Sequence, residues 1–357
     1  MPQSYTPPFT LTSRMVNRIA AVSELVGKLD ALGSITQNPH LRRSNRIRTI
    51  HSSLAIENNT LTLAQVTNII AGKRVLGPPD EIREVRNAYE AYQQLLRLDP
   101  YAVADLLRAH RILMAGLVTE AGVFRSGGVG VFAGDRLVHM APPAGFVPNQ
   151  IADLLAWCKT TDVHPLIVSC VFHAEFEFIH PFIDGNGRMG RMWQTLLLTR
   201  WNPLFAWLPI ESLIEQHQEQ YYAELGNAGK HGDDTAFVEF MLDVIQSALK
   251  DAASGRCHDT ENDIVNDTVC DTVNDSANDT VYYTAGSGPG YADIRLSVKE
   301  REVLEILRKN PQSTILAIVE QTGFSRPTVT RALAALKKYG VLRRIGSDKT
   351  GHWEVLT

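Results

Sequence analysis

The chain is poor in cysteine and lacks the spacing that a cysteine-rich site requires. Its 357 residues include four cysteines, none in a CxxC pair or with a histidine at zinc spacing: Cys158, Cys170, Cys257 and Cys270. A zinc cage or a disulfide framework is therefore not expected, and so few thiols suit a reducing compartment. The sequence also lacks a secretion signal at its N-terminus and any run of about 18 apolar residues, the length that spans a membrane. These absences predict a cytoplasmic protein without a membrane span.

Charge of one sign is not in large excess either. The formal net charge is −4, which gives no reason to expect that the whole molecule binds nucleic acid strongly. The distribution is uneven, however. Residues 257–290 carry seven acidic and no basic residues, whereas residues 291–357 carry 12 basic and 7 acidic ones. Asymmetry of this kind is typical of domains with different functions.

Helical periodicity dominates from Thr12 to about residue 252, because apolar residues recur there at steps of three and four. Met15, Val22 and Val26 show the pattern in the first helix. The same pattern, interrupted by Pro and Gly clusters, predicts further helices near residues 42–56, 62–71, 80–98, 101–117, 148–160, 164–179, 187–200, 210–226 and 234–252. The sequence thus predicts a mainly α fold.

One stretch, residues 126–140, departs from this periodicity. It is rich in glycine and β-branched residues and predicts a β-hairpin with its turn near Gly134-Asp135. Pro142-Pro143 then ends the second strand. A hairpin on a helical body has a free edge, which can pair with an extended segment of another protein. The alternative is a structural hairpin that covers an edge of the core.

The last hundred residues differ in composition from the rest. Residues 256–290 contain variants of the tetrad Asn-Asp-Thr-Val and predict a flexible acidic linker. Residues 291–357 predict a winged helix-turn-helix: a helix capped by Ser297, a second over Thr314–Gln321, a third from Ser325 to about Tyr339, and strands within 340–344 and 351–356. The third helix carries residues suited to DNA, namely Ser325, Arg326, Thr328, Thr330 and Arg331. A docking surface for a protein is the alternative.

The segment from His180 to Arg191, with the sequence HPFIDGNGRMGR, carries the strongest functional signal. It predicts a loop that leads into a helix. Its glycines let backbone N–H groups approach a ligand at the helix N-terminus, which is an anion site. Arg188 and Arg191 are three residues apart and suit a polyphosphate. Asp184 is an oxygen ligand suited to Mg²⁺, and His180, which titrates near neutrality, suits a general base.

Each of these residues alone would indicate only a capped helix with exposed arginines and a buried, satisfied histidine. Their combination within twelve residues favours a polyphosphate site instead. A Walker-type phosphate loop is excluded, because no Gly-Lys-Ser/Thr follows the glycines.

The same segment resembles the Fic-family motif HPFxDGNGRxGR and matches every fixed position. The resemblance extends from about residue 40 to 250. It implies a Fic-type helical core with a β-hairpin flap, and a protein adenylyltransferase that moves AMP from ATP to a Ser, Thr or Tyr hydroxyl of a target protein. By this resemblance, His180 deprotonates the hydroxyl, Asp184 holds Mg²⁺, and the two arginines bind the β- and γ-phosphates. The residues expected to bind ATP here are Asp184, Gly185, Asn186, Gly187, Arg188, Met189, Gly190 and Arg191.

The resemblance also implies roles outside this motif. The hairpin at 126–140 becomes the flap on which the target protein docks. Its strand nearest the nucleotide is expected at Leu137, Val138, His139 and Met140. Tyr221 and Tyr222 match a family pair that lines the adenine pocket, where an aromatic ring stacks on the purine. The family often has Asn seven residues after the second Tyr, whereas this chain has Gly229 there and Asn227 two residues earlier.

Residues 53–58, Ser-Leu-Ala-Ile-Glu-Asn, lie in the helix expected at about 42–57. Ser53 and Glu57 are four residues apart and share a helix face. Alone, Glu57 would be a surface carboxylate at a helix end. The segment nevertheless resembles the Fic inhibitory motif Ser/Thr-x-x-x-Glu-Gly/Asn, so Ser53, Glu57 and Asn58 are expected to inhibit, with Glu57 paired to Arg191. In some relatives this glutamate aligns a water that removes AMP, so deAMPylation is a further hypothesis.

These observations divide the chain into an N-terminal helical region at 1–110, a Fic catalytic core at 111–255, the linker at 256–290 and the winged-helix domain at 291–357. Two other functions stay open: a nucleotide-sensing DNA-binding transcription regulator, and phosphoryl or phosphocholine transfer on the same fold. The intact His180 favours the enzyme, since a sensor needs no base. The expected partners are ATP and a target protein. A homodimer stays open, because Fic proteins of this kind often dimerise.

Overall fold

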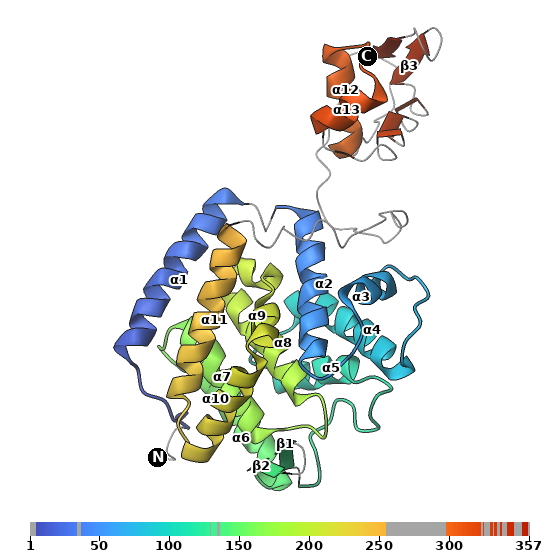
Figure 1. Cartoon of the computed structure of the whole chain (residues 1–357). Coiled ribbons are helices and arrows are strands. Elements are labelled where there is room, and N and C mark those ends of the chain that lie inside the picture. The colour runs from blue at the N-terminus through green and yellow to red at the C-terminus, as the bar shows by residue number, and fades with distance from the viewer. Residues whose placement is uncertain are drawn as a thin grey trace. The chain divides into compact units, whose positions relative to one another are not determined.

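The structure, a computed structural model, describes most of the chain: residues 5–33, 37–128, 130–133, 136–254, 298–322, 324, 329–330, 332–333, 336–337, 341–345 and 352–355. The chain divides into two units, Met1–Cys270 and Asp271–Thr357 (Figure 1). Each unit has buried apolar clusters of its own. The linker predicted at 256–290 lies outside the described residues. The boundary predicted at residue 110 falls inside the first unit and stays a prediction.

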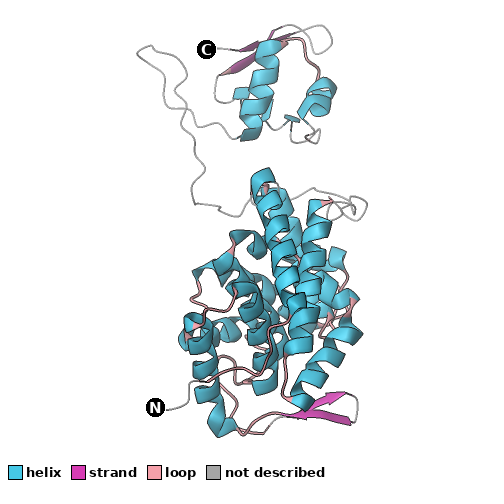
Figure 2. Cartoon of the chain, turned by 90° about the vertical axis from the view of Figure 1, so that its left-hand side faces the viewer, coloured by secondary structure: helices cyan, strands magenta, loops and turns pink. Residues whose placement is uncertain are grey.

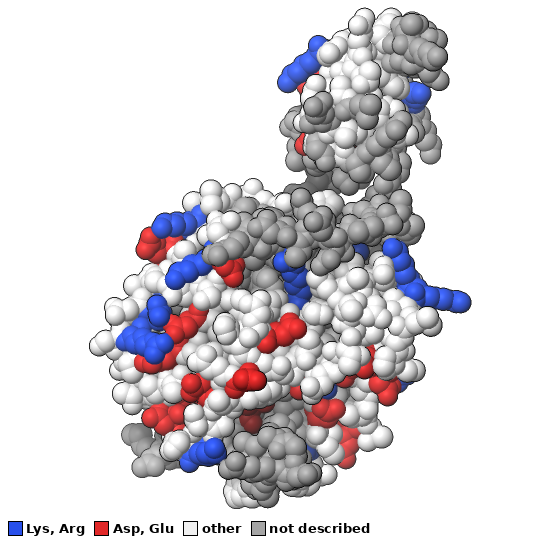
Figure 3. Space-filling view, viewed as in Figure 1, with Lys and Arg blue, Asp and Glu red and all other residues white. Residues whose placement is uncertain are grey.

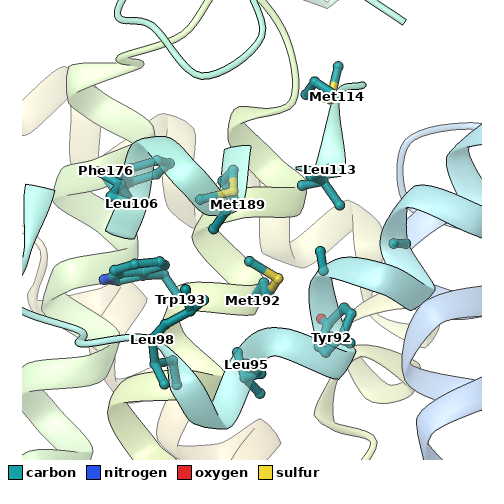
Figure 4. Packing of buried hydrophobic residues seen from close by; sticks show 14 of the residues in the cluster. Tyr92, Leu95, Leu98, Leu106, Leu113, Met114, Phe176, Met189, Met192 and Trp193 are labelled. Carbon is teal, nitrogen blue, oxygen red and sulfur yellow. The ribbon is translucent and has the colours of Figure 1, made fainter. Parts of the chain in front are cut away.

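Two helices, α7 (Pro165–Ile179) and α8 (Asn186–Trp201), form the centre of the first unit. They pack against each other (Figure 1). Most residues of both helices are buried, on all faces of each helix. This pattern is typical of a helix inside a core and not of one on its surface. Figure 4 shows Met189, Met192 and Trp193 of α8 among the apolar side chains that surround it. The predicted motif is therefore the connection between the two central helices.

The remaining helices of this unit surround the central pair. α2 and α5 contact α8, while α6, α10 and α11 contact α7. Their bounds are α1 (Ser13–Leu32), α2 (Pro39–Ala55), α3 (Leu63–Ile70), α4 (Pro79–Gln94), α5 (Val103–Leu113), α6 (Val147–Thr160), α9 (Ile210–Gln216), α10 (Gln218–His231) and α11 (Thr235–Ala253), with 3-10 turns η1 (Leu95–Arg97), η2 (Ala144–Phe146) and η3 (Pro203–Trp207). The predicted mainly α fold is confirmed.

Three predicted helices differ in extent from those observed. The stretch predicted at 210–226 is two helices, α9 and α10, which separate at His217. No Gly or Pro marks this break. α9 packs against α2 whereas α10 packs against α7, so tertiary packing overrides local propensity there. The helices predicted at 101–117 and 80–98 end earlier, at Leu113 and Gln94, because helix ends have weak sequence signals.

The predicted hairpin is present as β1 (Gly130–Ala133) and β2 (Arg136–Met140). The strands are antiparallel, with Val131 opposite His139 and Ala133 opposite Arg136. Figure 2 shows the hairpin at one end of the helical body, where β2 lies against α10. The turn at 134–135 and the side chains of both strands lie outside what the structure describes.

The second unit has the order predicted for a winged helix-turn-helix. It contains α12 (Val298–Lys309), α13 (Ile315–Thr322), and the antiparallel strands β3 (Leu342–Ile345) and β4 (His352–Val355). The described residues between 329 and 337 are helical. Buried residues from every one of these elements form its core, including Val303, Leu307, Ile318, Leu336 and Trp353. Of the side chains predicted to contact DNA, only Thr330 is described, and it is exposed.

The described surface of the first unit is mixed in charge. Figure 3 shows acidic and basic side chains interspersed over the face in view, as expected for a net charge of −4. Among the helices that the structure describes, none has the length and apolar character to cross a membrane.

Candidate active site

The connection between α7 and α8 contains two residues in the left-handed region. His180 ends α7 with φ 48° and ψ 63°, and Gly185 precedes α8 with φ 81°. This conformation costs a non-glycine residue roughly 1–2 kcal/mol, so surrounding contacts must hold His180 in place. A Cβ on Gly185 would lie 2.6 Å from Sδ of Met114, so glycine is needed there for space as well. α8 begins at Asn186, one residue before the helix start predicted at 187.

The side chain of Asn186 closes this loop on itself. Its Oδ1 accepts from the N–H of Phe182 and its Nδ2 donates to the carbonyl of the same residue, both at 2.9 Å. Asp184 Oδ1 accepts from the N–H of Gly185 at 2.5 Å. Both polar groups of the Asn186 amide are therefore used inside the loop. The group of Asn186 that could donate to a phosphate is therefore its backbone N–H, because the first N–H groups of a helix have no partner within the helix.

His110 on α5 supports the loop from behind. Its Nδ1 accepts from the N–H of Gly122 at 2.9 Å, so Nε2 carries the proton and donates to the carbonyl of Asp184 at 3.0 Å. Its ring stacks on Phe182 with centroids 3.6 Å apart. Burial lowers the pKa of His110 to about 4, which keeps it neutral. His110 has no signal in the sequence, because its partners lie 12 and 74 residues away.

The imidazole of His180 is oriented by the helix that it ends. Its Nδ1 lies 3.4 Å from the carbonyl oxygen of Glu177. A proton on Nδ1 donates to that carbonyl, and Nε2 then carries the lone pair that a general base requires. The backbone carbonyl of His180 accepts from Nε of Arg125 at 2.7 Å.

The two motif arginines are buried and bound to different acids. Arg188 donates to Glu84 of α4 at 2.8 Å and to Asp184 at 3.2 Å. Arg191 donates to Glu57 at 2.7 Å. The sequence predicted that both guanidinium groups bind a polyphosphate; in the structure each is paired with carboxylates of this chain. Glu84, 104 residues from Arg188, had no signal in the sequence.

Glu57 lies directly against the start of α8. A Cβ on Gly187 would collide with its Oε1, so the glycine provides room for the carboxylate. Ser53 completes the contact: its hydroxyl accepts from Arg191 Nε at 3.2 Å and its carbonyl from Nη2 at 2.9 Å. The expected Glu57–Arg191 pair is thus present. A carboxylate of this chain therefore lies close to the N-terminus of α8, the kind of position that also suits an anion.

Asn58 ends the helical segment that carries Glu57. Its φ is 66°, and its N–H donates to the carbonyl of Ala55 at 2.9 Å. Only glycine, asparagine and aspartate adopt this conformation readily. The alternation of Gly and Asn in the inhibitory motif therefore has a backbone cause.

Tyr221 and Tyr222, expected together at the adenine, have different surroundings. Tyr221 is buried, and its hydroxyl lies 2.9 Å from Nε2 of His173. His173 Nδ1 lies 2.6 Å from Oε1 of Gln194, and burial lowers the pKa of His173 to about 3. Tyr222 is 46% exposed, and its hydroxyl donates to the carbonyl of Ile56 at 3.2 Å. Of the pair, Tyr222 therefore offers the accessible ring.

A second carboxyl lies beneath the site. Burial raises the pKa of Glu177 to about 8, although Arg191 opposes the shift. A Cβ on Gly190 would lie 2.7 Å from its Oε1. The glycine at this position of α8 thus makes room for the Glu177 carboxyl.

Asp184 is the residue at this site that suits a magnesium ion. Its side chain is 55% exposed and offers carboxylate oxygen, the donor that magnesium prefers. The described residues contain no group of three or more His, Cys, Asp or Glu that could hold a metal. Magnesium bound with a polyphosphate needs only one or two carboxylates, so Asp184 fits that requirement. The side chains of Leu137 to Met140 lie outside the described part, and their contact with nucleotide stays a prediction.

Comparisons with known proteins identify the two parts of the chain. The Fic/DOC family matches residues 97–198, and a winged helix-turn-helix DNA-binding family matches residues 296–343. The protein adenylyltransferase Fic of Drosophila erecta is 30% identical over 242 residues, which is 64% of this chain and 47% of that protein. The chain thus spans about half the length of the curated relatives it matches.

Solved structures extend the likeness. A Fic-1 fragment from C. elegans, 23% identical, covers 68% of this chain and 72% of its own with a TM-score of 0.55, which supports the fold. The crystal structure of a Fic family protein from Desulfovibrio desulfuricans G20 is 42% identical with a TM-score of 0.70, and covers 99% of this chain and 98% of its own. With the motif, the fold and a relative matched over nearly its whole length, this chain belongs to the Fic family.

Proposed function

We propose that this chain is a protein adenylyltransferase and that Glu57 inhibits it. One observation carries the proposal: the Glu57 carboxylate lies against Gly187 at the start of α8 and binds Arg191. A helix start that accommodates a carboxylate also suits a phosphate. The histidine that ends the preceding helix provides a base beside that position. The relatives named protein adenylyltransferase Fic support the same activity.

In this proposal the triphosphate of ATP binds at the N-terminus of α8. His180 Nε2 takes the proton of the target hydroxyl, whose oxygen attacks the α-phosphorus. A bond forms between that oxygen and phosphorus, the bond from the α-phosphorus to the bridging oxygen breaks, and pyrophosphate leaves. Magnesium, held by Asp184 and the phosphates, would offset their charge. Catalysis would come mostly from positioning and charge stabilisation.

Inhibition follows from the pairing of Arg191. While its guanidinium binds Glu57, it is not available to the γ-phosphate, and the carboxylate repels that phosphate. A charge-assisted hydrogen bond contributes ~1.5–3 kcal/mol. If that contact must break before the reactive complex forms, the rate falls by ~10–100-fold. Glu57→Gly should therefore raise AMP transfer by this factor.

Mass spectrometry of the purified protein with ATP tests the proposal. A +AMP adduct is expected on the wild type, more on Glu57→Gly, and none on His180→Ala. Label should transfer from α-labelled but not γ-labelled ATP, which separates AMP transfer from phosphoryl transfer.

Equal amounts of adduct on Glu57→Gly and on the wild type would contradict inhibition by Glu57. Adduct on His180→Ala would contradict the base. Loss of adduct from premodified wild type, but not from Glu57→Gly, would show deAMPylation.

The match of residues 296–343 to a DNA-binding family supports a second candidate function, a nucleotide-sensing transcription regulator. A gel shift of the full chain on genomic fragments, with and without ATP, tests it. A shift that depends on ATP and persists in His180→Ala would favour this function over the enzyme.

A further inference from the structure

Arg125 stands between the hairpin and the catalytic loop, and its guanidinium is bound only to backbone carbonyls among the interactions described for it. It is 3% exposed. Nε donates to the carbonyl of His180 at 2.7 Å, and Nη2 donates to that of Ile179 at 3.2 Å. These carbonyls end α7, where a helix leaves carbonyls unpaired and where a cation is stabilised by the helix dipole.

The same guanidinium binds both sides of the base of the hairpin. Nη1 donates to the carbonyl of Gly127 at 2.9 Å, and Nη2 donates to that of Pro142 at 2.5 Å. Gly127 precedes β1 by three residues and Pro142 follows β2 by two. One rigid, planar group therefore ties the chain before the hairpin, the chain after it and the backbone of His180 to one point.

Two neighbouring contacts fix the position of Arg125 relative to the catalytic loop. Its own N–H donates to the carbonyl of Pro181 at 3.0 Å. The ring of Phe124 stacks on Phe182 with centroids 5.7 Å apart. The left-handed conformation of His180 is costly for a non-glycine residue, and these contacts help to maintain it.

We propose that Arg125 is a positioning residue that couples the target-docking hairpin to His180. This inference rests on the proposed adenylyltransferase function. If the backbone of the target protein pairs with the hairpin, the position of the base of the hairpin determines where the target's acceptor hydroxyl lies relative to the α-phosphorus. The base that accepts the proton is fixed by the same guanidinium. Arg125 thus sets the geometry between acceptor and base through backbone carbonyls, one of which belongs to His180. None of the hydrogen bonds described for Arg125 reaches α8, where the nucleotide would bind.

Kinetics in the Glu57→Gly protein test the coupling. Arg125→Ala should lower kcat for AMP transfer by roughly 10–100-fold, because misplaced reacting groups lose proximity. Its KM for ATP should stay within about twofold, since the α8 contacts of the phosphates remain. Arg125→Lys should fall between, because an ammonium cannot bind four carbonyls as a planar fork does. Arg200→Ala is the matched control: it removes a guanidinium bound to the carbonyl of Leu98 at 2.8 Å, and kcat should not change.

Two further measurements separate positioning from misfolding. Calorimetric titration with a non-hydrolysable ATP analogue should count one competent site per chain with unchanged affinity in Arg125→Ala. Hydrogen exchange at the amides of β1 and β2 should be faster in that variant. A kcat within about twofold of the parent, or analogue binding weakened as much as kcat, would overturn the inference, as would unchanged exchange. If Glu57→Gly itself transfers no AMP, the proposed function fails, and the exchange result alone then decides the coupling.

Discussion

Two acidic residues outside the motif, Glu175 of α7 and Asp234 before α11, are buried and lie next to each other. Burial, and next the neighbouring Glu175, raise the pKa of Asp234 to about 8. The hydroxyl of Tyr5 donates to Glu175, and the N–H of Asp234 donates to the carbonyl of Pro8 at 2.7 Å. The N-terminal arm is therefore packed onto a carboxyl pair that holds a proton at neutral pH.

This pair predicts a pH dependence of stability. The unfolded chain releases the Asp234 proton near pH 4, whereas the folded chain keeps it up to about pH 8. The free energy of unfolding should therefore fall as pH rises through this window and be largest below it. Asp234→Asn removes the titration, so its Tm should rise relative to the wild type from about pH 5 to pH 8. A Tm difference that is constant with pH would contradict this account.

The backbone of Asn58 carries a second prediction at the scale of one residue. Asn58→Gly keeps access to φ 66°, whereas Asn58→Val places a β-branched side chain there. The strain of roughly 1–2 kcal/mol should turn Glu57 away from Arg191. AMP transfer measured with α-labelled ATP should then rise by roughly 5–30-fold in the Val variant. The Gly variant should stay near the wild-type rate. Equal rates in both variants would mean that this turn does not hold the carboxylate.

At this scale, the sequence could predict only contacts between residues that are close together along the chain. The residues from His180 to Arg191 act within one turn-and-helix segment, so their spacing alone indicates an anion site. Arg125, His110 and Glu84 act on that segment from 55 to 104 residues away, and no spacing encodes such contacts. Glu57 was predicted only because its segment resembles a known motif; its position over Gly187 required the fold.

At the scale of elements, α10 holds the end of α2 beside the site. Gln218 Nε2 and the Tyr222 hydroxyl both donate to the carbonyl of Ile56, at 2.9 and 3.2 Å. That carbonyl belongs to the residue before Glu57. The two hydrogen bonds therefore restrain the inhibitory segment from a helix that also carries the expected adenine contact.

Removing either donor should weaken inhibition. One such hydrogen bond contributes about 0.5–1.5 kcal/mol, so Gln218→Met should raise the rate of AMP transfer by roughly 2–10-fold. Tyr222→Phe should act in the same direction while it keeps the ring. In Glu57→Gly neither substitution should raise the rate further, because the restrained carboxylate is gone. An increase that persists in that background would show that the effect does not pass through Glu57.

Elements with strong periodicity were predictable, and their junctions were not. The central helix α7 follows from a largely apolar sequence that begins after His164, and Asp184-Gly185 marks the turn before α8. The break between α9 and α10 at His217 has no such punctuation. α9 packs on α2 and α10 packs on α7, although both also contact α11; this packing is a property of the assembled core.

At the scale of the whole molecule, the chain consists of two units with separate cores. The clusters of the first unit end at Leu249, and that of the second begins at Val303. A composition change at residues 256–290 predicted this division from the sequence. Because each unit buries its own apolar residues, each meets the basic requirement for folding alone.

Residues 1–254, expressed alone, should therefore fold and keep the candidate site intact. Their unfolding transition should lie within about 3 °C of the corresponding transition of the full chain, since the buried contacts that set it are all retained. In the Glu57→Gly background, AMP transfer per folded chain should also match that of the full chain. A matched Tm with slower transfer would show that the winged-helix unit acts on catalysis. A lower Tm would show instead that the two units stabilise each other, because such coupling is absent from independent cores.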